Sequence, residues 1–189
     1  DTLHAVRFNE TSRIRDLVNQ QRARRDQSIT GNGHSLAMTA ACAGMSPLAH
    51  LHHHQSGLAG IRRLRTLDDS LADKHGLQNF ADRLDALHAK MLSTPMQFLV
   101  IAEDHKVAEV AELASAVWSQ GSTGKESPSF TLDNTRERRG EVWLTNTQVN
   151  FCARAYPTVP EQHPDAAALT VLGGFLRNGF LHRAIREQG

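Results

Sequence analysis

The chain has 189 residues, of which 40% are hydrophobic and 22% are charged, and its formal net charge is +1. This length and composition exclude a disordered or fibrous protein and predict one or two compact units. The small net charge gives no reason to expect a nucleic-acid or anionic-membrane partner, because long-range attraction of such partners requires a large or segregated charge.

Targeting and redox signals are weak. No apolar run approaches the roughly 20 residues that span a bilayer, and residues 1–10 mix charged and apolar side chains, unlike a signal peptide. Two cysteines, Cys42 and Cys152, cannot make a disulfide framework and are interpreted as small buried residues in a reducing compartment. We therefore expect a cytoplasmic protein.

Most of the first 120 residues have helical periodicity. Small residues favour close helix packing, Gly44 is a natural helix end, and Ser46-Pro47 is typical of a helix start. The predicted helices are one that carries Ile14, Leu17 and Val18 and ends near the turn 31–33, one at 35–43, one from Ser46 to near Gly57, two with apolar repeats at 61–71 and 77–91, and one at 107–118.

The apolar pattern changes after Pro95. Residues 96–102, 142–145 and 149–156 have strand length, and the last of these alternates apolar and polar residues. The helix at 107–118 is expected to pack on the sheet that contains the first strand. Further helices are predicted from Pro164 and through Leu181. So few strands leave sheet edges unsatisfied, which predicts that the second domain continues beyond residue 189.

Residues 121–140 contain glycine, serine and a charged run, which is typical of a solvated linker. We therefore predict a first unit at 1–120, a linker at 121–140 and a second unit at 141–189.

Two stretches of the chain carry a resemblance to a known family. The first is Ser-Ile-Thr-Gly-Asn-Gly-His-Ser-Leu-Ala at 28–37, continuing to 58–61, and the second runs from 148 to 157 and continues at 163–165 and 181–187. In this order they resemble the presequence-protease-like branch of the pitrilysin/insulinase zinc metallopeptidases. The resemblance implies an α+β fold in which helices pack on a mainly antiparallel sheet. It also implies that the first unit is the later part of a third peptidase-like domain and the second unit the beginning of a fourth.

The zinc motif of this family, His-x-x-Glu-His, does not occur in the chain. We therefore expect no cofactor or metal here, no catalytic residue and no peptidase activity of the chain by itself, with zinc held by the N-terminal half of the parent protein. The cluster His50, His52, His53 and His54 offers an alternative metal site, because His50 and His54 share a helix face. Without a carboxylate or cysteine beside it, we interpret the cluster as a polar helix end, and its role stays open.

Arginines are grouped at 13–25 and 62–65, where the interleaved apolar positions favour a solvated face or a docking surface for the other half of the protease over nucleic acid. Arg186 is the one substrate-binding residue that the resemblance implies, since an arginine at this place in the family reaches the peptide bound at the zinc. A helix-capping role is the alternative.

Two functions therefore remain open. The first is a non-catalytic part of a zinc metalloendopeptidase that degrades short unstructured peptides, with the N-terminal catalytic half of the same polypeptide and the peptide as partners. The second is an independent α/β protein-interaction module. The peptide substrate and any self-association of the chain are not determined by the sequence.

Overall fold

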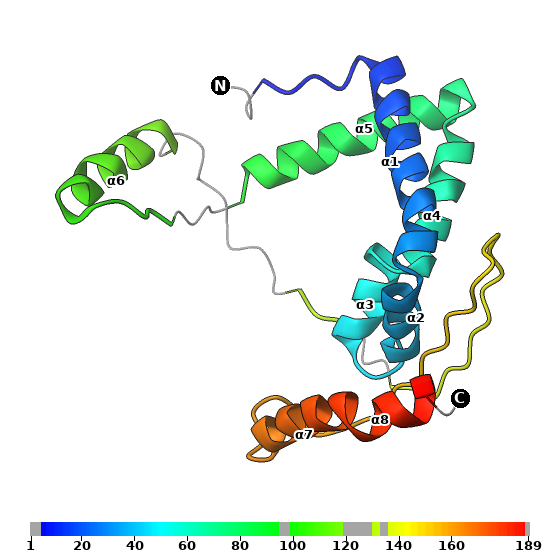
Figure 1. The fold of residues 1–189 in the computed structure, drawn as a ribbon. Coiled ribbons are helices and arrows are strands. Elements are labelled where there is room, and N and C mark those ends of the chain that lie inside the picture. Colours follow the sequence, from blue (N-terminus) through cyan, green and yellow to red (C-terminus); the bar gives the residue numbers. More distant parts are fainter. Residues whose placement is uncertain (1–4, 95–98, 119–129, 133–135, 188–189) are drawn as a thin grey trace. The chain divides into compact units, whose positions relative to one another are not determined.

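The computed structural model describes residues 5–94, 99–118, 130–132 and 136–187, without the side chains at 117, 118 and 186. The chain divides into two units, Asp1–Ala153 and Arg154–Gly189. The helices of the first unit are α1 (Thr11–Gly31), α2 (Gly33–Cys42), α3 (Pro47–Gln55), α4 (Leu58–Ser70), α5 (Lys74–Leu92) and α6 (Asp104–Trp118) (Figure 1). Those of the second are α7 (Ala166–Asn178), α8 (Phe180–His182) and the π-helical turn η1 (Arg183–Glu187).

Local sequence signals explain where these helices begin and end. The Ser46 side chain caps α3 by accepting a hydrogen bond of 3.1 Å from the Ala49 backbone N–H, and proline follows at the first helical position. The Asp73 carboxylate caps α5 in the same way. The predicted helices of the first 120 residues are thus confirmed, each with small differences at its ends.

The core of the first unit lies where α1, α2 and α4 meet. Ile29, Leu36 and Ile61 are buried against one another, and Leu58 packs on them. Helix α1 lies beside α4 and also contacts α5, while α3 contacts α2 and α4 (Figure 1). Burial of these apolar side chains is the main stabilising contribution of the packing.

Ion pairs fasten α1 to α4 beside this core. The Arg22 guanidinium donates hydrogen bonds to Asp68 at 2.8 Å and to Asp69 at 2.7 Å, and Arg65 of α4 donates to Asp26 of α1 at 2.9 Å. The hydrogen bond to Asp68 is the main reason why the pKa of Arg22 is raised. Two of the grouped arginines therefore bind carboxylates within the fold, while the sequence alone indicated a solvated or docking face.

The predicted α+β fold is wrong, because the described residues form helices and no strand. Residues 99–102, 142–145 and 149–156 have no regular secondary structure and pair with no strand in the described part of the chain, and residues 96–98 lie outside the description. A β-strand requires a hydrogen-bonded partner, which an apolar pattern cannot supply. The predicted packing of α6 on a sheet is wrong for the same reason.

Glycines let the segment 137–151 approach the helices. A Cβ at Gly44 would meet the Glu137 carbonyl, and a Cβ at Gly33 would meet the ring of Phe151. By contrast, nothing lies within 4 Å of a Cβ at Gly31. Gly33 and Gly44 therefore act as close-contact positions as well as residues near helix ends.

The second unit consists of α7, α8 and η1. Asp165 precedes α7, as expected for a helix predicted from Pro164, and Gly179 follows its last residue, but no side chain of α7 or α8 is buried. Val171, Phe175 and Phe180 are 74%, 73% and 68% exposed. The described part of this unit thus has helices without an apolar core of its own.

The predicted linker at 121–140 lies largely outside the described residues, so the predicted domain division stays a prediction. None of the described helices combines the length and the hydropathy of a membrane-spanning segment.

Candidate functional site

The histidine-rich helix α3 presents its imidazoles on different sides. The rings of His50 and His54 lie against each other with their planes tilted by 32° and their centroids 4.2 Å apart, and Nδ1 of His54 is hydrogen-bonded to the His50 carbonyl at 2.9 Å. His53 lies on another side and is only 1% exposed. His52 is exposed. The cluster is therefore a pair of tilted, contacting rings, one buried imidazole and one solvated imidazole.

Residues 137–143, which we call the strap, cross α3 at His53. The strap is held at one end by the Glu137 N–H, which donates to the Gly44 carbonyl at 3.0 Å. At the other end the Arg62 guanidinium lies 4.1 Å from the centre of the Trp143 ring, in a cation–π contact. A backbone hydrogen bond and a side-chain contact thus attach the strap to the helices.

His53 contacts the strap through its ring and through Nε2. The His53 and Trp143 rings meet edge to face at 6.1 Å, and Nε2 of His53 lies 3.7 Å from Oε2 of Glu141. The same Glu141 oxygen accepts a 2.7 Å hydrogen bond from Nε1 of Trp143. Arg139 lies 3.7 Å from the other Glu141 oxygen. One carboxylate therefore links the buried imidazole, the indole and an arginine.

The pKa of His53 is lowered. Burial is the largest cause, because it removes water from the charged imidazolium, and nearby His54, Arg139 and His50 act in the same direction. Glu141 opposes these effects without reversing them. The buried imidazole is therefore neutral near pH 7.

The described residues contain no group of three or more His, Cys, Asp or Glu side chains that could hold a metal ion. The tilted rings of His50 and His54 do share a helix face as predicted, yet no third ligand accompanies them among the described residues. The geometry supports a polar contact site for the strap.

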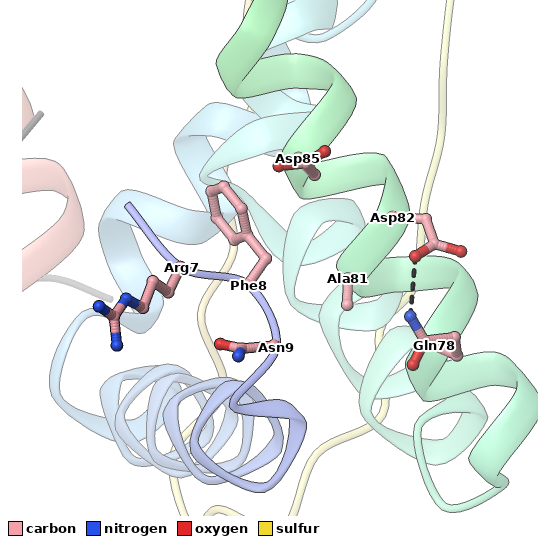
Figure 2. A pocket seen from close by; sticks show the side chains of 7 residues that line it. All are labelled: Arg7, Phe8, Asn9, Gln78, Ala81, Asp82 and Asp85. Carbon is pink, nitrogen blue, oxygen red and sulfur yellow. Dashed lines mark hydrogen bonds between the residues drawn. The ribbon is translucent and has the colours of Figure 1, made fainter. Parts of the chain in front are cut away.

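Pockets occur in the described part of the first unit beside α5. The pocket in Figure 2, of about 310 Å³, is formed by residues 7–9 and by Gln78, Ala81, Asp82 and Asp85 of α5. Gln78 donates to Asp82 at 2.8 Å, and Arg7 points away from α5 (Figure 2). A second pocket of about 580 Å³ lies where the first turns of α1 and α5 meet. Both are lined by carboxylates and by basic side chains.

Comparison with known proteins gives one consistent result. The family model of a peptidase-associated region, from subfamily C of peptidase family M-16, matches residues 1–67. A protein named "Presequence protease, mitochondrial" from Aspergillus fumigatus is 27% identical over 86% of this chain, and its namesakes from Yarrowia lipolytica and Danio rerio are each 25% identical over 100% of it. No solved structure is significantly similar.

The resemblance to presequence-protease-like peptidases is confirmed. The chain spans only 16%, 19% and 20% of the lengths of these three relatives. It is thus similar to a peptidase-associated, C-terminal region of presequence proteases.

The expected cytoplasmic location is wrong, because the presequence proteases that match the chain are named mitochondrial. The physical argument from Cys42 and Cys152 concerned only a reducing environment and could not distinguish compartments. Moreover, both cysteines are exposed, so the prediction that they are small buried residues is also wrong.

Arg186, the predicted substrate-binding residue, lies in η1, and its side chain is outside the description. The role implied by the presequence-protease resemblance stays a prediction. Sequence reasoning missed Glu141 and Trp143, because the first stood next to the predicted linker and the second within a predicted strand. A tryptophan two residues after a glutamate, directly behind the charged run at 136–141, was the available signal.

Proposed function

We propose that this chain is a non-catalytic part of a zinc metalloendopeptidase of the presequence-protease type and forms part of the chamber that receives short unstructured peptides. The observation that carries this proposal is the similarity to presequence proteases over 86% to 100% of the chain. The match of residues 1–67 to a peptidase-associated family model supports it independently.

In this proposal the zinc ion and the catalytic residues belong to an N-terminal catalytic half of the same polypeptide. The full sequence of this chain contains no His-x-x-Glu-His motif, in which two imidazoles and a glutamate would bind zinc and activate water. The chain alone is then inactive, and its partners are the catalytic half and the peptide. The names of the relatives support a mitochondrial location for it.

Exposed apolar side chains support a role as part of a larger assembly. Single exposed apolar residues are normal in soluble proteins, but large side chains that are almost fully exposed are candidates for burial elsewhere. Side chains of this kind, each at least 73% exposed, occur in segments without regular secondary structure and in α7: Leu99, Ile101, Phe130, Val142, Leu144, Val171 and Phe175. We propose that the remaining part of the peptidase covers them.

Arg186 is the proposed substrate contact. A guanidinium carries donors in a fixed fork, so it can hold a peptide carbonyl and stabilise negative charge that develops on that oxygen when water attacks. A lysine at the same position would keep the charge but lose the fork. The distinction makes the role testable.

A chimera tests the proposal. In the Yarrowia lipolytica presequence protease, whose matching segment is 25% identical to this chain, the segment is replaced by residues 1–189. We expect the chimera to cleave an unstructured peptide in a chelator-sensitive manner, whereas a version that lacks the segment should be inactive. A chimera that is folded, binds zinc and cleaves no peptide would contradict the proposal and favour an independent interaction module.

A further inference from the structure

His53 has an unequal hydrogen-bonding environment. Its Nδ1 is buried without a partner and lies near Gly57, where an added Cβ would sit 2.8 Å from that nitrogen. Its Nε2 faces the Glu141 carboxylate at 3.7 Å. Only one of the two ring nitrogens therefore faces an acceptor.

This arrangement suits a neutral imidazole. In the neutral ring one nitrogen carries a hydrogen and the other is an acceptor, so a hydrogen on Nε2 faces Glu141 and leaves Nδ1 without one. The imidazolium carries a hydrogen on both nitrogens, and the second N–H would be buried beside Gly57 without an acceptor. The geometry alone thus disfavours the protonated ring.

The charges around His53 come from each element packed on it. His50 and His54 of α3 and Arg139 of the strap oppose protonation, while Glu141 favours it. Arg62 of α4 does not face His53 directly but lies over the Trp143 ring, which the His53 ring contacts. Burial outweighs Glu141, so that the pKa of His53 lies below its ordinary value of 6.5.

We propose that His53 is a pH-sensitive contact that holds the strap, residues 137–143, on α3 when its imidazole is neutral and releases the strap when the imidazole is protonated. Release returns the imidazolium to water and separates Glu141 and Trp143 from α3. The device lies within this chain and does not depend on the proposed peptidase role.

The direction with pH follows from the linkage between protonation and folding. With the strap released, His53 regains a pKa near 6.5, whereas with the strap docked its pKa is lower. The docked form is therefore favoured fully above pH 6.5 and loses its advantage as the pH falls from 6.5 through the lowered pKa. Within this window the equilibrium constant for release increases by up to about tenfold for each pH unit by which the pH falls.

Hydrogen exchange of the Glu137 amide measures the release, because this N–H donates to the Gly44 carbonyl only when the strap is docked. We expect its protection factor in the purified 189-residue chain, corrected for the intrinsic pH dependence of exchange, to fall by up to about tenfold between pH 6.5 and 5.5. Carboxyl groups ordinarily titrate below this window.

Two variants separate His53 from the other histidines. His53→Gln cannot titrate, so its Glu137 protection should not vary between pH 7.5 and 5.5. His52→Gln changes an exposed residue of the same helix and should behave as the wild type. A wild-type protection factor that is constant over this range, or a His53→Gln variant that loses protection as the wild type does, would overturn the proposal.

A titration of the wild type keeps the proposal testable if His53→Gln does not fold. The imidazole of His53, followed by NMR through its ring Cε1–H, should titrate below 6.5. A His53 that titrates at or above 6.5 while the Glu137 amide stays protected would overturn the proposal, because protonation would then not oppose docking.

Discussion

Substitution of Gly33 by alanine tests whether the segment 137–151 is docked on α2 through Phe151. The added Cβ would meet the Phe151 ring, so the ring or the helix must move. Overpacking of this kind costs roughly 1–3 kcal/mol. The alanine also favours helix formation by up to about 1 kcal/mol. We therefore expect Gly33→Ala to lower the free energy of unfolding by about 1–2 kcal/mol.

Gly31→Ala is the matched control, because nothing lies within 4 Å of the added Cβ. Gly31 is the last residue of α1 and does not have a positive φ angle, so alanine fits its backbone. We expect Gly31→Ala to leave the free energy of unfolding unchanged or to raise it by up to about 1 kcal/mol. Urea titrations followed by far-ultraviolet circular dichroism measure both variants.

A double-mutant cycle identifies the cause. Phe151 is half-buried, so Phe151→Ala should cost about 2 kcal/mol, roughly half of the loss for a fully buried phenylalanine. In the Phe151→Ala background the Cβ added at Gly33 no longer meets a ring, so the cost of overpacking disappears. This gives a coupling energy of about 1–3 kcal/mol between the two sites. The reasoning is refuted if Gly33→Ala is as stable as Gly31→Ala, or if the coupling energy is zero.

Three further predictions concern activity and organisation. The purified chain should bind no stoichiometric zinc and cleave no unstructured peptide, as measured by metal analysis and a peptide assay, and chelator-sensitive cleavage that copurifies with it would contradict this. Limited proteolysis should cut first between residues 121 and 140, where few apolar residues anchor the chain, and first cuts in 77–91 or 149–156 would show that the boundary is misplaced. In the active chimera, Arg186→Lys should lower peptidase turnover by about ten- to a thousand-fold with little change in melting temperature, and full turnover would assign Arg186 to the helix end.

The helices of the first unit could be predicted from the sequence because their signals are local. A serine followed by proline starts α3 at Ser46, and the apolar repeat of α4 needs only neighbouring residues to be recognised. The resemblance to presequence proteases was also available from the sequence, since it depends on the order of residues along the chain. These properties are determined without knowledge of distant contacts.

The strands and the histidine contact could not be predicted in this way. Residues 142–145 have a strand-like pattern, but Val142 and Leu144 remain 89% and 96% exposed because no partner strand lies beside them in the described part of the chain. His53 and Glu141 are far apart in the sequence and meet only because the strap crosses α3. A sequence pattern indicates which face of a segment is apolar, whereas the tertiary structure decides what that face and its charged neighbours contact. For this reason only the tertiary structure shows that His53, among the four histidines of α3, is a buried and neutral contact.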